Sequence, residues 1–233
     1  MKRLFYILAI AAFAFSCTTD AYEKGEGKYS LMRGDFVEAR VDASRQIVSF
    51  CTDDGEEYDL TEPYAGKWIK TPDTLYRCML YYNKVESQKA ELVSIGEVPC
   101  PRIKTLSELK KDLRTDPVKF ESMWLSKSGK YLNLYLQLKT GVTDDTTAVQ
   151  QLAFISDTII ANPNQTTTHH ITLHHDQNRV PEYYSTKAYV SILTDSIAAD
   201  SVCISINTYS GLVTNLSLFG KKCNIYIYLQ NHR

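Results

Sequence analysis

Several features that would point to a particular chemistry are missing from this 233-residue sequence. It has no G-x-S-x-G, H-E-x-x-H, P-loop or glycine-rich dinucleotide pattern, the signatures of common hydrolases, zinc proteases and nucleotide-binding enzymes. Its cysteines form no C-x-x-C pair, which argues against zinc ribbons and thioredoxin-like redox chemistry. The sequence therefore predicts a protein that is not an enzyme and needs no cofactor. A cryptic hydrolase, with a serine or cysteine brought to His170 only by folding, remains the alternative.

The sequence also lacks a surplus of basic charge. Without Lys2 and Arg3 it carries 24 basic against 27 acidic residues. Proteins that bind nucleic acid concentrate basic side chains on one surface, because phosphate contacts dominate their affinity. No nucleic-acid partner is expected.

The apolar run from Leu4 to Phe15 is too short to cross a bilayer, which requires about 20 residues. It follows two basic residues and ends at Ser16-Cys17, as in a lipoprotein signal peptide over residues 1–17. We expect Cys17 to be acylated and to anchor the chain in a membrane, although an ordinary secretory signal is the alternative. Residues 18–28 then form a flexible tether. The predicted location is the outer membrane, facing either the periplasm or the cell surface.

Alternating apolar residues indicate an all-β fold in two domains. Over residues 29–100, short strand patterns and the Asp-Gly signal at 54–55 predict a small barrel. Residues 101–117 are expected to be a helical linker, with a capping box at Thr105 and Glu108 and with Leu106, Leu109 and Leu113 on one face. Residues 118–231 alternate strictly enough to predict an antiparallel β-sandwich, with Leu132, Leu134, Leu136 and Leu138 on an inward face.

Five cysteines remain after Cys17, an odd number, so at least one would be unpaired in an oxidising compartment. Disulfide pairing is left open among Cys51, Cys78, Cys100, Cys203 and Cys223.

The order of these elements resembles the NigD-like lipoproteins of Bacteroidota. The residues that carry the resemblance are Asp116-Pro117-Val118, Met123-Trp124-Leu125, the 129–134 stretch Gly-Lys-Tyr-Leu-Asn-Leu, and His170-x-x-Leu173. The resemblance implies an N-terminal OB-like barrel, a C-terminal β-sandwich and an envelope location. The family name is linked to a bacteriocin operon, so an accessory or self-protection role is an alternative function.

Four histidines between His169 and His175 raise the question of a metal site. Ile171, Thr172 and the threonines before them favour a strand, in which His170 and His174 would lie about 13 Å apart. One ion cannot bind both at that separation, since its ligands lie about 2 Å from the metal. No metal site is expected, and His170 and His174 are only weak candidates.

Tyrosines on the non-aliphatic side of two predicted strands are candidates for a ligand face. They are Tyr131, Tyr135, Tyr226 and Tyr228. Exposed rings would stack on sugars or contact a protein partner. The alternative is that a loop or the other domain covers this face.

The pattern Asp, then Ser or Thr, then an aliphatic residue or Thr occurs five times, and it resembles the O-glycosylation acceptor of Bacteroidota envelope proteins. Thr146 and Ser196 are the acceptors expected to lie in loops. The overall prediction is a lipid-anchored binding or scaffold module whose partner is an envelope protein or a glycan.

Overall fold

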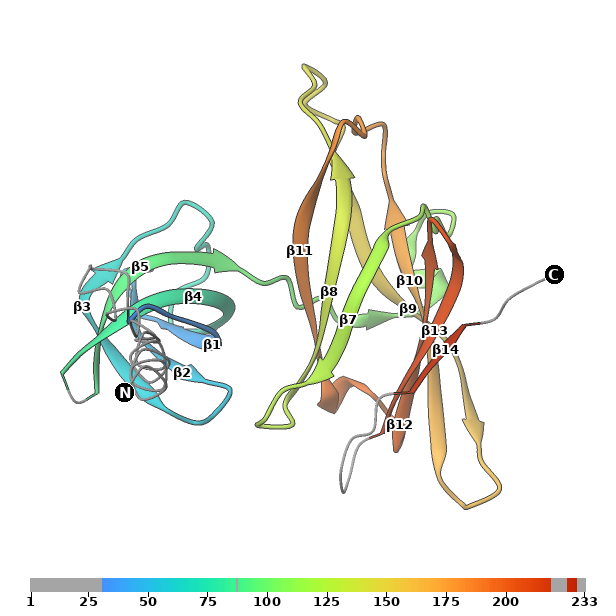
Figure 1. Cartoon of the computed structure of the whole chain (residues 1–233), viewed down its shortest axis with the longest axis horizontal. Coiled ribbons are helices and arrows are strands. Elements are labelled where there is room, and N and C mark those ends of the chain that lie inside the picture. Colours follow the sequence, from blue (N-terminus) through green and yellow to red (C-terminus); the bar gives the residue numbers. More distant parts are fainter. Residues whose placement is uncertain (1–30, 87, 219–225, 230–233) are drawn as a thin grey trace, which may run out of the picture.

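The chain folds into two all-β domains (Figure 1). The computed structural model describes residues 31–86, 88–218 and 226–229. The first domain is a closed barrel, and the second is a sandwich of a six-stranded and a three-stranded sheet. The predicted all-β class and the order of the two domains are confirmed.

The barrel contains five strands in the order β1-β2-β3-β5-β4, and β1 closes it by pairing with both β2 and β4. The described neighbours are antiparallel except β3 and β5, which run parallel. This is the OB-like arrangement that the resemblance implied. The strands are β1 (Arg33–Val41), β2 (Ile47–Thr52), β3 (Glu57–Tyr64), β4 (Leu75–Glu86) and β5 (Lys89–Glu97).

Alternation along the strands builds the barrel core. Val37, Ala39 and Val41 point inward from β1 and are at most 2% exposed. Across the interior, the Phe50 ring lies 4.9 Å from the ring of Tyr82, measured between centroids. The residues between these positions point outward, since successive side chains of a strand lie on opposite faces.

The predicted hairpin after β2 forms, although its loop has four residues, from Asp53 to Glu56, rather than two. Gly55 has a φ of +82°, a backbone conformation that side chains with a Cβ rarely adopt. The Gly55 amide donates to the carbonyl of Thr52 at 2.9 Å, which closes the turn.

The sandwich stacks a sheet in the order β14-β13-β12-β10-β9-β6 against a sheet in the order β11-β8-β7. Most pairs are antiparallel as predicted, but β10 and β12 run parallel, as do β6 and β9. The chain leaves the six-stranded sheet after β10, forms β11 in the three-stranded sheet and returns to the first sheet as β12. Because of this crossover, β12 runs in the same direction as β10. The strands are β6 (Ile103–Lys104), β7 (Lys119–Leu125), β8 (Tyr131–Thr140), β9 (Gln151–Ala161), β10 (Thr167–Asp176), β11 (Tyr184–Leu193), β12 (Ser201–Thr208), β13 (Gly211–Leu218) and β14 (Tyr226–Leu229).

Leucines of β8 form the centre of the sandwich core. Leu132, Leu134, Leu136 and Leu138 alternate along the strand, and all are at most 7% exposed. They belong to one apolar cluster that also includes Ile204 of the facing sheet. The inward set predicted from the alternation is therefore confirmed.

The segment 101–117 differs from the predicted helical linker. Helix α2 covers only Leu106–Leu109 and buries none of its residues. The capping interaction does form, because Glu108 accepts a hydrogen bond from the Thr105 amide at 2.8 Å. On either side of α2 the chain pairs with the sandwich, through β6 and through the bridge between Thr115 and His175. These pairings, which local sequence does not reveal, place most of the segment inside the second domain.

The predicted signal peptide, the tether and Cys17 lie outside the described residues, as does Cys223. Within the described ranges, no helix is long and apolar enough to cross a membrane. The four described cysteines, Cys51, Cys78, Cys100 and Cys203, carry free thiols.

Candidate functional site

The two domains meet at a joint centred on Arg77 of β4. The guanidinium forms a two-pronged ion pair with Asp53, with N–O distances of 2.6 and 2.7 Å. It lies over the ring of Tyr131, 4.0 Å from the centroid, and donates to Asn133 Oδ1 at 3.2 Å. The Arg77 side chain is only 2% exposed, so its charge depends on these partners. Arg77 therefore connects a turn and a strand of the barrel to β8 of the sandwich.

Asn133 is the polar residue of the sandwich that receives Arg77. It lies between the core leucines of β8 and is fully buried. Its Oδ1 also accepts a hydrogen bond from Ser191 Oγ of β11 at 2.7 Å. The side-chain carbonyl of Asn133 thus connects the barrel, through Arg77, to the sandwich, and it connects β8 to β11 within one sheet.

A second set of contacts surrounds Glu38 of β1. Its carboxylate accepts hydrogen bonds from the Tyr131 hydroxyl and the Lys130 ammonium group. Burial alone would raise the pKa of Glu38, but the bonds from Lys130 and Tyr131 lower it below the ordinary value. Burial and the bond to Glu38 raise the pKa of Tyr131, so its proton stays on the hydroxyl and is donated across the joint.

Aromatic and backbone contacts complete the joint. The ring of Phe36 from the barrel lies edge-on to Trp124 and Tyr189 of the sandwich, at centroid distances of 5.6 and 5.3 Å. The amide of Ser191 donates to the carbonyl of Pro99 at 2.9 Å. Because charged, aromatic and backbone contacts act together, we treat the two domains as one unit. We call this set of contacts the interdomain joint.

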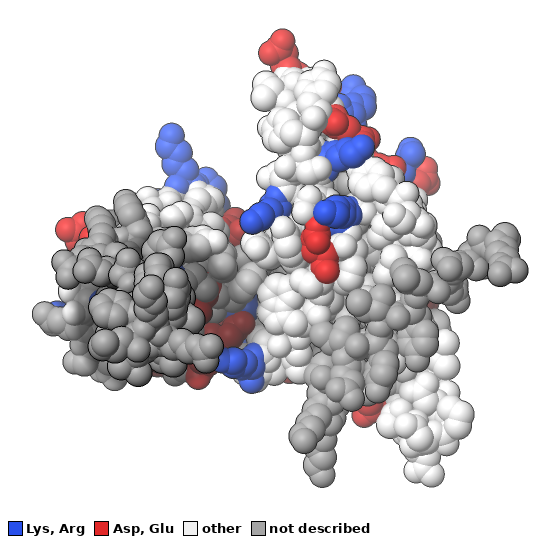
Figure 2. Space-filling model, viewed as in Figure 1, with Lys and Arg blue, Asp and Glu red and all other residues white. Residues whose placement is uncertain are grey.

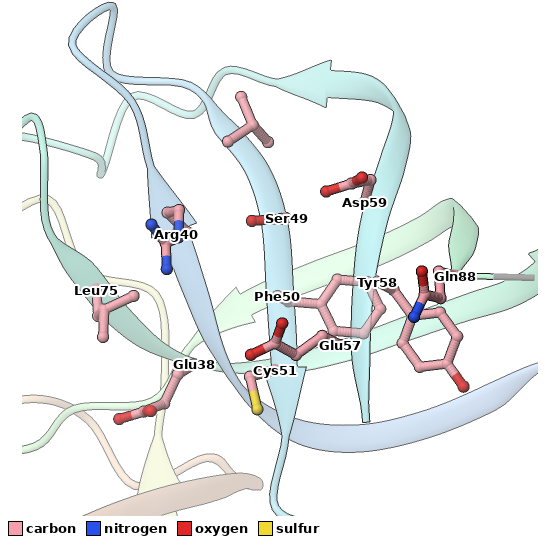
Figure 3. Close-up of a pocket in the computed structure, with 11 residues that line it drawn as sticks. Glu38, Arg40, Ser49, Phe50, Cys51, Glu57, Tyr58, Asp59, Leu75 and Gln88 are labelled. Atoms are coloured by element: carbon pink, nitrogen blue, oxygen red, sulfur yellow. The ribbon is translucent and has the colours of Figure 1, made fainter. Parts of the chain in front are cut away.

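The outer face of β1, β2 and β3 forms a shallow depression of about 610 Å³, which we call the β2 trough (Figure 3). Ser49 and Cys51 of β2 are half-buried and form its floor. Longer charged side chains stand on the two neighbouring strands, as Figure 3 shows. These are Glu38 and Arg40 on β1, and Glu57 and Asp59 on β3.

The thiol of Cys51 reports the electrostatics of the trough floor. Burial raises its pKa, and the nearby carboxylates of Glu57 and Glu38 raise it further. A thiol in this setting stays protonated at neutral pH and is a poor nucleophile. Covalent chemistry at Cys51 is therefore disfavoured.

The predicted tyrosine face is only partly available. Tyr131 is 6% exposed and lies beneath Arg77, so its ring is part of the interdomain joint and not a free ligand surface. Tyr135 is half-buried and stacks on Tyr189 at a centroid distance of 5.0 Å. The barrel covers part of this face, as the alternative interpretation proposed. Tyr226 and Tyr228 belong to β14, where the side chains fall outside the described residues.

His170 and His174 lie on one face of β10, four residues apart, as the strand prediction required. Among the described residues, no group of three or more His, Cys, Asp or Glu side chains is arranged to hold a metal ion. His174 has a structural contact instead, because its Nδ1 accepts a hydrogen bond from the Arg114 amide at 3.0 Å. His174 therefore helps to hold the 113–116 segment on the sandwich.

We expect the sandwich to lose stability as pH falls from about 7 to 5.5. Burial lowers the pKa of His174 and of His169, so both stay neutral in the folded state while the unfolded chain takes up protons near pH 6.5. For each histidine, every unit by which the folded-state pKa lies below the unfolded-state pKa lowers the unfolding free energy by about 1.4 kcal/mol, reached in full at pH values below the folded-state pKa. Urea unfolding of residues 18–233 at pH 7.5, 6.5 and 5.5 measures the effect.

The matched variants for this measurement are His174→Asn and His170→Asn. Asparagine at position 174 keeps an acceptor for the Arg114 amide but does not titrate, so the pH dependence should become shallower. The same change at the half-exposed His170 is the control and should alter the pH dependence less than His174→Asn does. Equal pH dependence in all three proteins would contradict the assignment to His174.

Ser156 and His169 form the contact most similar to a hydrolase site. Ser156 Oγ lies 2.8 Å from His169 Nε2. A triad also needs an acid at Nδ1, yet within the described chain this nitrogen of His169 is buried without a hydrogen-bond partner. His169 is only 5% exposed, which keeps a substrate from reaching the pair. The contact is better explained as core packing.

Both predicted glycosylation acceptors are exposed. Thr146 lies in the loop between β8 and β9, and Ser196 ends the short 3₁₀ helix η2 (Thr194–Ser196), where its hydroxyl donates to the Leu193 carbonyl at 2.6 Å. Ser201, in a third copy of the pattern, is 2% exposed and unavailable. Glycosylation of Thr146 and Ser196 stays a prediction.

Sequence reasoning did not find Arg77, Asn133 or the β2 trough. A signal for the first two was present, because Arg77 interrupts an apolar strand and Asn133 interrupts a run of leucines. Such residues indicate a buried polar contact, but not which partner makes it. The trough has no comparable signal, because its residues look like an ordinary solvated strand face.

Comparison with known proteins identifies a family and solved structures with a similar fold. The family described as the NigD-like C-terminal beta sandwich domain matches residues 102–218. A NigD-like immunity protein from Bacteroides caccae superposes with a TM-score of 0.61 at 20% identity, over 85% of this chain and 97% of that one. A search of curated protein sequences gives no significant match.

Two further solved structures share the architecture. A candidate toxin-related protein from Parabacteroides distasonis has a TM-score of 0.58 at 15% identity, over 84% of this chain and 93% of that one. A candidate lipoprotein from Bacteroides fragilis has a TM-score of 0.56 at 11% identity, over 84% and 96%.

Proposed function

The chain belongs to the NigD-like family, and we propose that it is a lipid-anchored protein of the cell envelope that acts as a non-enzymatic binding module. The anchor is the acylated Cys17, and the outer membrane is the location, with the folded domains facing the periplasm or the cell surface. A candidate lipoprotein among the solved structures with this fold supports the anchor.

The observation that carries the binding role is the interdomain joint next to the β2 trough. Lys130 of the sandwich bonds Glu38, which is also a wall residue of the trough. The joint therefore holds the trough in place from outside the barrel. A prearranged surface of this kind loses little conformational entropy when a ligand binds.

Replacing Cys17 with alanine tests the anchor. In a host of the Bacteroidota, we expect this variant to lose all fatty-acid labelling and to leave the membrane fraction, because two or more acyl chains give stable attachment. Cys51→Ala is the matched control and should keep both the label and the location. Unchanged labelling of Cys17→Ala, or wild-type protein found in the cytosol with Met1 attached, would refute the proposal.

Self-protection against a bacteriocin is a second candidate function, favoured by the description of one structural relative as an immunity protein. Strains that carry the wild type or Cys17→Ala distinguish self-protection from binding of an envelope component. If the anchored protein gives protection, the Cys17→Ala strain should be as sensitive to the bacteriocin as a deletion strain. If the protein only binds an envelope component, sensitivity should not change.

A further inference from the structure

We propose that the β2 trough binds a neutral, polyhydroxylated ligand, that is, an oligosaccharide. This inference rests on the proposed function and names the class of ligand that the binding module takes. It depends on four properties of the trough: its shape, the pairing of its backbone within the barrel, its small net charge and its exposed polar groups.

The shape follows from strand register. Arg40, Ser49 and Asp59 are side-by-side partners across β1, β2 and β3. Glu38, Cys51 and Glu57 form the next row, two residues along. In each row a small side chain lies between two long ones, so the face is hollow along β2, and Figure 3 shows both rows from above. Rows on one face repeat about every 6.6 Å, which gives the trough a direction along the strand.

The backbone of the trough cannot recruit an extended peptide. β2 pairs with β1 on one side and with β3 on the other. Its amides and carbonyls are therefore used within the barrel, whereas strand addition requires an open sheet edge. A ligand in the trough has to be recognised by side chains.

Charge argues against a highly charged ligand. The trough has three carboxylates, on Glu38, Glu57 and Asp59. Arg40 is the basic side chain of the lining, and Lys130 bonds Glu38 from the sandwich. With Lys130 counted, the trough has an excess of only one negative charge. On the upper part of the sandwich in Figure 2, Lys and Arg also lie close to Asp and Glu. Polyanions and polycations both require an excess of one sign.

The polar groups that remain suit hydroxyl groups. Arg40, Glu57 and Asp59 are exposed, so their polar groups can reach a bound ligand. Carboxylates accept from hydroxyl groups, a guanidinium donates to hydroxyl and ring oxygens, and the Ser49 hydroxyl does both. Sites for drug-like molecules are lined mainly by apolar side chains. Here Leu75 at one side, 51% exposed, is the main exposed apolar contact. A sugar presents many hydroxyls and a small apolar face, which matches this lining.

The test is calorimetric titration of residues 18–233 with a defined set of probes. Maltohexaose, cellohexaose and mannohexaose are the neutral oligosaccharides, a heparin hexasaccharide is the polyanion, and octalysine is the polycation. We expect at least one neutral oligosaccharide to bind and neither charged probe to bind more tightly. Ser49→Tyr, which fills the floor, and Asp59→Asn, which removes a carboxylate, should each weaken binding about tenfold or more.

Glu62→Gln is the matched control, since Glu62 is an exposed carboxylate of β3 outside the trough. Its affinity should stay within about twofold of the wild type. Circular dichroism confirms that each variant is folded, and Asp59→Asn gives a result even if Ser49→Tyr does not fold.

Three outcomes would overturn the inference. Failure of every neutral oligosaccharide to bind at millimolar concentration excludes the ligand class, and so does tighter binding of either charged probe. If a neutral oligosaccharide binds equally well to the wild type, Ser49→Tyr and Asp59→Asn, the binding site lies outside the trough. The proposed binding function would then stand, but the trough would not be its site. The anchor is tested separately by Cys17→Ala, so the two proposals fail independently.

Discussion

Replacing Arg77 with methionine is expected to cost about 3–5 kcal/mol of unfolding free energy and to separate the two domains. The variant leaves the Asp53 carboxylate without its cation in a largely buried position, 19% exposed. Removing one partner of a buried ion pair is strongly destabilising, because the remaining charge stays desolvated. It also removes the donor to Asn133 and the cation over Tyr131.

The measurement is urea unfolding of residues 18–233 in a Trp68→Phe background, monitored by tryptophan fluorescence. The remaining Trp124 lies against Phe36 in the interdomain joint and reports its opening. We expect the wild type to unfold in one transition and Arg77→Met to unfold in two, with the joint opening first.

Arg102→Met is the matched control, because Arg102 makes an ion pair with Glu108 while 65% exposed. Exposed pairs contribute about 0–1 kcal/mol. The double variant Asp53→Asn with Arg77→Met should lose less than the sum of the single variants, since no unpaired charge remains. If Arg77→Met costs no more than Arg102→Met, the joint does not hold the domains together.

Replacing Leu134 with alanine is expected to cost about 2–5 kcal/mol, the range for buried leucines in well-packed cores. Leu134 is fully buried on the central strand of the three-stranded sheet, between Met123 and Val190. The lost methyl groups leave a cavity between two sheets, whose hydrogen bonds prevent the strands from closing it.

Leu113→Ala provides the control for this prediction, measured by the same urea unfolding. Sequence spacing predicted Leu113 on the apolar face of a helix, but it is 39% exposed and lies outside α2. Its replacement should change the unfolding free energy by less than about 0.5 kcal/mol. Similar losses at both positions would mean that the core is not centred on β8.

Local periodicity was sufficient for the elements that bury one face against a core. Alternation places Val37, Ala39 and Val41 on one face of their strand, and it does the same for the leucines of β8. The structure buries both faces. Turn and cap chemistry were equally readable. Gly55 has the positive φ that its turn requires, and Glu108 bonds the Thr105 amide.

The same periodicity failed where a second surface covers the polar face. Tyr131 lies opposite the leucines in the alternating pattern, a position that is usually exposed, yet the barrel buries it beneath Arg77. The helix predicted to continue to Leu113 ends at Leu109, where Lys110 adopts a left-handed conformation, and Arg114 and Asp116 then bond the backbone of His175 in β10. Long-range partners decided both cases.

The sequence by itself determined the all-β class, the order of barrel and sandwich, the inward sets of β1 and β8 and the family. Each of these depends on neighbours along the chain, since the side-chain period of a strand is fixed by backbone geometry. Only the tertiary structure decided the joint and the trough. Arg77 and Asn133 are 56 residues apart, and the trough takes its walls from three strands. Contacts at such separations depend on how completed sheets are placed, and no local pattern encodes that placement.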